Sequence, residues 1–528
     1  MTEGPHINNA ADTRRRRAPV LPGLASAGGA LLCAVALACN NPTPDLRPPP
    51  FGPDTNHPEA VRLFFPSGMT VYKPTGHLLV VNGNFDHAFD GGTIVSFDPA
   101  RDFQPYFSYY DSSGALPATQ LLPVIAPLVR GVAMVGNYGG PLEVYADPAS
   151  GRVRAFTASR DGNAVHSVQL DPATGVLSCK GGGPTDIDCR RGVFDTFGAV
   201  CPAGLCPPGP TTLSLEGPYG LAVGDAALPG ATTPPNNVLF VSALIPHIDA
   251  ILNNTLYMRS QFAAVTLDSA APSLFYAANA SSETVANGIG AGPIVFDKAR
   301  RRLILGGCYT RTASANGSAL SSYKCTSSSA NLLRFVSVDE GPDANVQAVD
   351  IAAVIRSLET TGLALGGVDP SDPNQIPQRL YAALRNPDLL VEMDLPATPG
   401  QFVTVLRATA LPVAPAGLAV LPRPATGSGP PPPPDLIAVA AEASGNVTIY
   451  DTGSGQVVAN LEGLGKLPYT LTVLQPQPAD TAAAGANLAD PRAHLAATVF
   501  DGCALALIDV PYQRPWKSAL RAILGSCP

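Results

Sequence analysis

The chain has 528 residues, with 33 Lys and Arg against 41 Asp and Glu, which gives a formal net charge of −8. Gly and Pro together number 51 + 55 = 106, about a fifth of the chain, and this indicates many turns and few long helices. Because 45% of the residues are hydrophobic and only 14% are charged, the composition excludes a disordered chain. We therefore expect a globular, loop-rich protein made mainly of β-strands.

An export signal is predicted at the start of the chain. A basic block at residues 14–17 is followed by an apolar stretch at residues 24–38, which ends at Cys39. A charged region, an apolar region of this length and small residues before a cleavage point are the parts of a secretory signal. The stretch is shorter than the ~20 apolar residues that a membrane-spanning helix needs. Residues 1–39 are therefore predicted to be a signal peptide.

The end of this segment, Ala36-Leu37-Ala38-Cys39, resembles the lipobox of bacterial lipoproteins, although Ala36 stands where that family usually has Leu. The resemblance implies that Cys39 is acylated and anchors the protein in a membrane. Residues 40–60 are polar and Pro-rich, as in a tether. Asn40 is not the Asp that the family associates with inner-membrane retention, which favours the outer membrane. Ordinary cleavage after an Ala, releasing a soluble product, is the alternative.

The mature chain is acidic. Removing residues 1–39 leaves 33 − 4 = 29 basic and 41 − 2 = 39 acidic residues, a formal charge of −10. Such a field repels nucleic acid and anionic lipid head groups. The charge therefore excludes a nucleic-acid partner, whereas the oligomeric state is not indicated by any pattern.

Cysteine usage agrees with export. Eight cysteines remain in the mature chain, and an even number in an oxidising compartment indicates disulfides. A zinc site is the competing interpretation, but there is no CxxC motif and the histidines lack ligand spacing. We expect no metal or cofactor, and we expect pairing between neighbours: Cys179 with Cys189, Cys201 with Cys206, Cys308 with Cys325, and Cys503 with Cys527.

A repeated unit organises residues 61–528. Each copy has an apolar strand, a turn, a second strand, a polar loop and a third strand, most often ending in Asp. Seven copies follow one another, and they begin near residues 66, 142, 217, 292, 362, 415 and 467. In the clearest copy, Val447 and Ile449 alternate with Thr448 and Tyr450, which predicts a strand with one face on a core and the other outward.

Sheet modules repeated in this way predict an all-β fold, a single β-propeller of seven blades that closes on itself and leaves no long free edge. The repeats exceed the ~40–50 residues of common propellers. Long inserted loops account for the difference, notably residues 424–435 and 479–492, each between the first and second strands of its module.

The opening Pro-x-Gly-Leu-Ala-Val at residues 415–420 and the hairpin at residues 447–458 resemble the YVTN-type β-propeller repeats of bacterial surface and periplasmic proteins. The resemblance is good over residues 415–473 and fair over 66–98, and the tetrapeptide itself is absent. It implies the propeller fold. Some relatives in that family are similar to lactonases, and others are similar to adhesion or binding modules.

A propeller brings the loops between the second and third strands to one end of its central channel. These loops supply a candidate rim of polar residues, and the strongest candidates for catalysis are Asp86, His87, His247, Arg385 and Glu442; the wider set adds Asp90, Arg160, Asp161, Asp249, Tyr309, Arg311, Asn386, Asp388, Ser444, Asn446 and Asp501. Polar rim loops are ordinary in secreted propellers, so the alternative is that these residues have no catalytic or binding function.

No GxSxG, HExxH or P-loop motif is present. We therefore expect a non-enzymatic binding or scaffold module of the cell envelope that contacts protein or glycan. A lactonase-type or metal-dependent hydrolase acting at the channel mouth is the alternative.

Overall fold

The computed structural model describes residues 61–527 except for a set of internal segments, namely 88, 108–117, 180–185, 207–211, 231–234, 246, 253–254, 260, 269–271, 280–287, 290–291, 311–328, 344–345, 351–358, 368–375, 397–402, 422–434 and 475–491. The predicted signal peptide, Cys39, the tether and most of the two long inserted loops lie outside the described residues. Within the described part, none of the helices has the length and apolar character needed to span a membrane.

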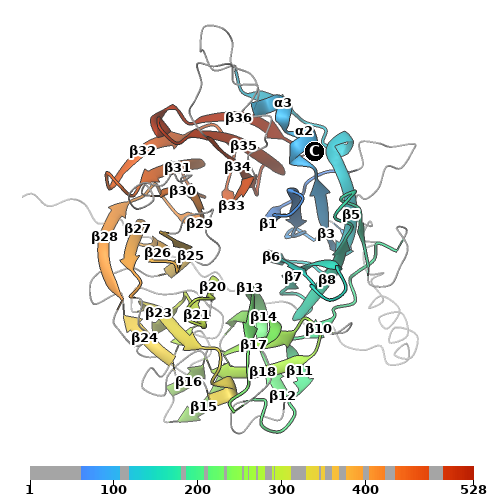
Figure 1. The fold of residues 1–528 in the computed structure, drawn as a ribbon, viewed down its shortest axis with the longest axis vertical. Coiled ribbons are helices and arrows are strands. Elements are labelled where there is room, and N and C mark those ends of the chain that lie inside the picture. Colours follow the sequence, from blue (N-terminus) through green and yellow to red (C-terminus); the bar gives the residue numbers. More distant parts are fainter. Residues whose placement is uncertain are drawn as a thin grey trace, which may run out of the picture. The chain divides into compact units, whose positions relative to one another are not determined.

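Seven antiparallel sheets, here called blades 1 to 7, follow one another around a ring (Figure 1). This confirms the predicted all-β, seven-bladed propeller. In each blade the first strand lies innermost, around the axis. The first three blades are built as follows: blade 1, β1 (Pro66–Tyr72), β2 (His77–Asn82), β3 (Gly92–Phe97) and β5 (Val129–Val135); blade 2, β6 (Gly139–Ala146), β7 (Val153–Ser159), β8 (Ala164–Leu170), β9 (Leu177–Ser178) and β10 (Phe194–Asp195); blade 3, β13 (Glu216–Ala226), β14 (Asn236–Ile245), β17 (Gln261–Thr266) and β18 (Leu274–Asn279).

The remaining four blades repeat the pattern, and the seven predicted modules correspond to the seven blades in order. Blade 4 contains β20 (Ile294–Asp297), β21 (Arg302–Leu305), β23 (Ser329–Ser337) and β24 (Val346–Asp350), with β19 (Gly288–Ile289) and β22 (Cys308–Thr310); blade 5, β25 (Glu359–Gly366), β26 (Arg379–Arg385), β27 (Leu389–Asp394) and β28 (Thr404–Ala410); blade 6, β29 (Pro415–Leu421), β30 (Leu436–Ala441), β31 (Asn446–Asp451) and β32 (Gln456–Leu461); blade 7, β33 (Pro468–Leu474), β34 (Arg492–Val499), β35 (Ala504–Pro511), β36 (Ala519–Leu524) and β4 (Gln120–Leu122).

Short ribbons and helices lie around the ring of blades. Among the described residues, two extra ribbons lie outside the blades, and each helix is a single turn. They are β11 (Phe197–Val200) with β12 (Thr212–Ser214), β15 (His247–Leu252) with β16 (Thr255–Arg259), α2 (Pro99–Asp102), α3 (Gln104–Phe107), η2 (Ala126–Leu128), η3 (Gly341–Asp343) and η5 (Pro515–Lys517).

The core is divided among the junctions between blades. Each of seven clusters of buried hydrophobic side chains joins two successive blades, and the cluster between blades 7 and 1 closes the ring. Every blade therefore buries both of its faces. This explains why a middle strand such as β2 or β30 is buried at all of its six residues.

The prediction that β31 turns one face outward is wrong for this reason. Val447 and Ile449 pack in the cluster between blades 6 and 7, as expected of an inward face. Thr448 and Tyr450 are nevertheless buried as well, at 0% and 1% exposure, and Tyr450 packs in the cluster between blades 5 and 6. The alternation in the sequence separates two junctions of the ring, not a core from solvent.

The ring is closed by side-chain contacts and by one added strand. Thr470 of β33 donates from Oγ1 to the carbonyl oxygen of Ser67 in β1 at 3.0 Å, which joins blade 7 to blade 1. β4, from the connection between the third and fourth strands of blade 1, pairs in parallel with β36 and extends blade 7 outward. Segments far apart in the sequence thus complete the last blade.

Three of the four expected cysteine pairs are disulfides in the structure: Cys179–Cys189, Cys201–Cys206 and Cys503–Cys527. The last of them ties the C-terminal segment to the turn between β34 and β35. Cys325, the expected partner of Cys308, lies outside the described residues.

Candidate functional site

The innermost strands are bulged where they begin. In six of the seven blades the pairing of the first strand with the second shifts register near the start of the first strand. A bulge turns consecutive side chains away from regular alternation. Residues at the bulges, among them Ser67, Tyr219, Thr361 and Tyr469, line the central channel.

Close approach between blades explains the Pro-x-Gly opening of the repeats. A Cβ on Gly68 would lie 2.2 Å from the carbonyl oxygen of Gly140, and one on Gly417 would lie 2.3 Å from the carbonyl oxygen of Tyr469. Only glycine permits such contact between neighbouring backbones. The glycines therefore set how tightly the inner strands surround the axis.

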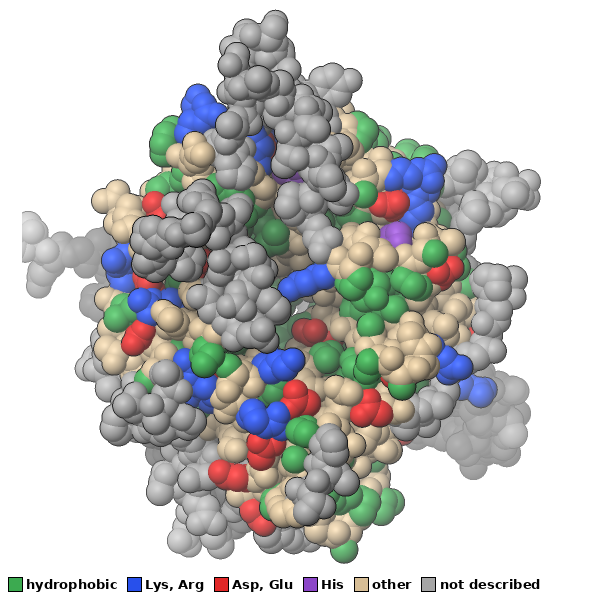
Figure 2. Space-filling view, viewed as in Figure 1, with side chains coloured by type: hydrophobic (Ala, Val, Ile, Leu, Met, Phe, Trp, Pro, Cys, Tyr) green, Lys and Arg blue, Asp and Glu red, His purple; other side chains and the backbone are tan. Residues whose placement is uncertain are grey.

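The channel at the centre of the ring has a volume of about 480 Å³ and is lined by residues of all seven blades. This volume lies within the range of small-molecule sites, roughly 300–1,000 Å³. Figure 2 shows basic and acidic side chains around the opening at the centre of the ring. The charged and phenolic residues that line the channel are Glu143, Arg160, Tyr219, Glu359, Arg385, Glu442 and Tyr469.

Arg160, in the loop between β7 and β8, lies at the mouth of this channel. Its guanidinium carbon lies 5.3, 5.7 and 5.8 Å from the ring centres of Phe85, Tyr138 and Tyr219. These distances are those of cation–π contacts. Within the described part of the chain, Arg160 has neither a hydrogen bond nor an ion pair, and its Nε is buried without a partner. Aromatic rings hold the cation in place, while its N–H donors are left unused by the described residues.

An aromatic cluster surrounds this cation. Phe85 packs edge to face against Tyr138 and Phe500, with ring centres 5.0 and 4.9 Å apart. Phe500 also contacts Phe65 at 5.2 Å and Tyr469 at 6.0 Å. We call Phe65, Phe85, Tyr138, Tyr219, Tyr469 and Phe500 the mouth aromatics. They come from blades 1, 3 and 7 and from the link between blades 1 and 2.

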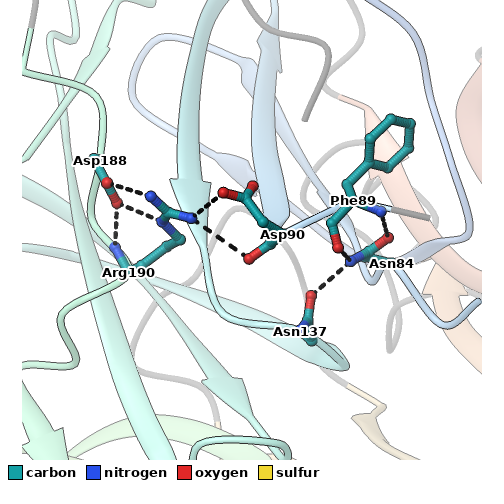
Figure 3. A network of polar contacts seen from close by, with 6 residues as sticks. All are labelled: Asn84, Phe89, Asp90, Asn137, Asp188 and Arg190. Atoms are coloured by element: carbon teal, nitrogen blue, oxygen red, sulfur yellow. Dashed lines mark hydrogen bonds and ion pairs between the residues drawn. The ribbon is translucent and has the colours of Figure 1, made fainter. Parts of the chain in front are cut away.

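The loop that carries Phe85 is fixed by an amide network (Figure 3). Asn84 donates from Nδ2 to the carbonyl oxygen of Phe89 at 2.8 Å and to Oδ1 of Asn137 at 2.7 Å, and it accepts from the Phe89 N–H. Asp90 of the same loop accepts from Arg190 at 2.7 Å, and Arg190 also pairs with Asp188. The network joins blade 1 to blade 2 and holds Phe85 at the mouth.

One ion pair and one hydrogen-bonded pair of side chains lie further around the channel. Arg385 pairs with Glu442 at 2.7 Å, across blades 5 and 6. The hydroxyl oxygens of Tyr219 and Tyr469 lie 2.8 Å apart. Burial raises the pKa of both phenols, so that both are protonated at neutral pH. The Tyr pair therefore consists of two neutral hydroxyls, one donating to the other.

Glu143, on the inner strand β6, faces the channel without a hydrogen bond or ion pair to any described residue. Burial in the channel wall raises the pKa of this carboxyl from 4.5 to about 8, and the positive charge of Lys73 opposes the shift. Glu143 is thus mostly protonated at neutral pH. It was absent from the predicted rim because it lies within a strand.

We expect the Glu143→Gln variant to be more stable than the wild type above pH 8, by up to about 5 kcal/mol, and equally stable near pH 4. The folded protein keeps a proton that the unfolded chain loses as the pH rises from about 4.5 to 8, so wild-type stability falls across this window. Urea unfolding at pH 4 and pH 9 measures the difference. A Glu462→Gln change at an exposed position is the matched control. If the free energy of unfolding of Glu143→Gln differed from that of the wild type by the same amount at pH 4 and pH 9, this account would be contradicted.

The structure brings only some of the predicted site residues together. Arg385 and Glu442 line the channel as a pair. His87 is exposed beside the mouth, where its Nε2 lies 2.5 Å from the hydroxyl of Tyr138. Asp86 is exposed on the same loop and has an interaction partner of its own. His247 begins the ribbon β15–β16, and its side chain lies outside the described part.

Among the wider set, Arg160 is the residue that the channel mouth is built around. Sequence reasoning missed Glu143, Tyr219 and Tyr469. Tyr219 and Tyr469 occupy the position after Pro at the start of an inner strand, the same position as Ser67, so the repeat pattern contained a signal for them. No group of three or more His, Cys, Asp or Glu side chains within the described ranges is arranged to hold a metal ion.

The fold and the channel define a class: a seven-bladed β-propeller with a polar, cation-bearing mouth. No protein-family model and no curated protein sequence matches the chain. Solved structures similar to it include a protein from Lactobacillus plantarum (14% identity, 74% of this chain and 82% of that chain, TM-score 0.39), a putative 6-phosphogluconolactonase from Bacteroides fragilis (11%, 74% and 82%, 0.37) and apo AztD from Citrobacter koseri (12%, 77% and 88%, 0.38). At these identities and scores the similarities carry no argument about activity.

Proposed function

We propose that the protein is a lipoprotein of the bacterial cell envelope whose propeller is a non-enzymatic binding module, and that it takes glycan or protein at the channel mouth. One observation carries the binding role: Arg160 lies on three aromatic rings with its hydrogen-bonding groups unused among the described residues. Aromatic residues and Arg are the side chains enriched where proteins bind partners. The half-buried mouth aromatics and Arg160 supply both kinds of side chain around one opening.

The anchoring part of the proposal rests on the sequence of residues 1–60. We expect mass spectrometry of the protein purified from membranes of a bacterial host to find acyl chains on Cys39 as the first residue. A Cys39→Ala variant is expected to leave the membrane fraction, because it has no thiol to acylate and stable anchoring needs more than one lipid chain. An unmodified N-terminus produced by cleavage at another position would favour the alternative of a secreted, soluble protein.

The binding part is tested with an array of bacterial envelope glycans and with cross-linking in envelope extracts. We expect the wild type to retain specific ligands, and a Phe85→Ala, Tyr138→Ala variant to lose them by at least about 10-fold, because the rings that hold Arg160 are removed. A Phe197→Ala variant, which truncates an exposed aromatic residue on β11, is the matched control. Equal retention by all three proteins would contradict a binding face at the mouth.

One observation favours the alternative hydrolase. A carboxyl group with a pKa of about 8 in a cavity is suited to donate or accept a proton during catalysis, and Glu143 meets this description. Steady hydrolysis of simple lactones by the wild type, abolished in Glu143→Gln, would transfer the proposal to the enzyme class. The absence of turnover with either protein is the result expected of a binding module.

A further inference from the structure

We infer that the channel mouth binds a singly charged carboxylate carried by a hydroxylated ligand, that is, an acidic sugar, with Arg160 holding the carboxylate. The inference rests on the proposed binding function and specifies its ligand. It follows from which hydrogen-bonding groups of the channel are already used and which are left over.

Donors are in excess at the mouth. Arg160 keeps its N–H groups, since its described contacts are with rings only. In the pair of Tyr219 and Tyr469, one hydroxyl hydrogen is used between the two oxygens and the other has no described acceptor. A planar guanidinium beside a spare O–H matches the two oxygens of a carboxylate.

The charge balance favours one negative charge over two. Glu442 is already paired with Arg385, so Arg160 is the cation of the lining that a ligand can neutralise. Glu359 and Glu442 line the same channel as Tyr219 and Arg160. A phosphate monoester would place a second negative charge against these carboxylates, which costs free energy in a partly enclosed site.

Acceptors are in excess next to this position. Ser67, Thr361 and Thr470 line the channel at the bulges, and each donates its hydroxyl hydrogen to a backbone carbonyl of a neighbouring strand, at 2.6, 2.8 and 3.0 Å. Their oxygens retain lone pairs that can only accept. Ligand hydroxyls supply the missing donors. A carboxylate at one end and hydroxyls along the body are the features of a sugar acid.

The probes that test this are galacturonate and its trimer, with galactose as the uncharged match and galactose 1-phosphate as the phosphate match. The protein is the full chain purified from host membranes, and binding is measured by calorimetry and by thermal shift. We expect galacturonate to bind at least about 30-fold more tightly than galactose, and galactose 1-phosphate to bind less well than galacturonate.

Two kinds of variant locate the contact. Arg160→Met keeps the unbranched apolar stem of the side chain without its charge and is expected to reduce galacturonate affinity by at least about 30-fold, whereas an Arg152→Met change at an exposed turn has no effect. Tyr219→Phe keeps the aromatic bed, removes a hydroxyl and is expected to weaken binding about 5- to 10-fold. It remains informative if Arg160→Met fails to fold.

Each outcome decides between the inference and the function it rests on. Equal affinity for galactose and galacturonate, or full binding by Arg160→Met, overturns the acidic-sugar ligand while leaving a glycan-binding mouth intact. Absence of sugar binding together with a cross-linked protein partner lost in the Phe85→Ala, Tyr138→Ala variant overturns the inference alone. If the variants at the mouth bind sugar and protein partner as well as the wild type does, both the acidic-sugar inference and the proposed binding function of the mouth are overturned.

Discussion

Replacing Asp297 with alanine is expected to destabilise the protein by about 3–5 kcal/mol, a cost typical of a buried ion pair that loses one partner. The Asp297 carboxylate is completely buried and accepts from Arg300 at 3.0 Å and from Arg302 at 3.1 Å. The side chains of these two arginines are only 2% and 8% exposed. Removing the carboxylate leaves both guanidinium charges in the interior without the ion pair that they make with Asp297.

The loss extends to the next blade. Arg300 donates from Nε to the carbonyl oxygen of Pro396 at 2.7 Å and from a terminal nitrogen to that of Leu395 at 3.0 Å. Asp297 therefore orients the side chain that joins blade 4 to the end of β27 in blade 5. Because a ring has no redundant junction, we expect the whole transition in urea to shift.

Urea unfolding followed by circular dichroism measures this change. The matched control is Asp394→Ala, which breaks the pair with Arg379 at a site where the Asp side chain is 45% exposed. Exposed pairs contribute about 0–1 kcal/mol, so the control should unfold close to the wild type. A loss of less than 1 kcal/mol in Asp297→Ala would show that the buried triad does not hold blades 4 and 5 together.

The second large effect is expected for Gly417→Ala, at the junction of blades 6 and 7. The added Cβ would lie 2.3 Å from the Tyr469 carbonyl oxygen, 2.9 Å from Thr470 Cα and 3.2 Å from Leu471 N. All three are backbone atoms of β33, so relief requires moving an inner strand. We expect a loss of about 2–3 kcal/mol, as for overpacking of a tight interior.

A calorimetric melting temperature with and without the probe galacturonate tests both parts of this account. Gly162→Ala is the matched control, since its Cβ would meet only the Cβ of Ala164, at 4.0 Å. That variant is expected to match the wild type within about 0.5 kcal/mol. Because β33 carries Tyr469, Gly417→Ala should also lower the affinity for galacturonate. If the stability of Gly417→Ala equalled that of the wild type, the close-packing explanation of the Pro-x-Gly motif would be refuted.

The fold could be predicted from the sequence because each blade is encoded locally. Strand, turn and strand patterns of the kind seen at residues 446–461 recur seven times, and the strands lie where these patterns place them. What the pattern cannot contain is the partner of each face. Thr448 and Tyr450 read as an outward face, yet they are buried because blade 5 covers them.

The site was harder to predict because it is assembled across the ring. Arg160 belongs to the expected rim, but two of the rings around it come from positions about 75 residues before it and about 60 after it, and only the packing of blades 1, 2 and 3 next to one another brings them together. The segment 84–90 is the richest polar cluster of the sequence. The amide of Asn84 turns out to brace the loop, and Asp90 is engaged by Arg190. A dense polar cluster can thus serve to position an aromatic side chain.

Hydrogen exchange with and without saturating trigalacturonate tests the central claim, that the mouth is the binding face, most directly. The account predicts slower exchange at residues 83–87, 136–138 and 160–163, which surround the mouth aromatics and Arg160. Protection there, absent in Arg160→Met, would support it. Protection confined to the turns at the opposite end of the blades, at residues 73–76, 147–151 and 452–455, would contradict it.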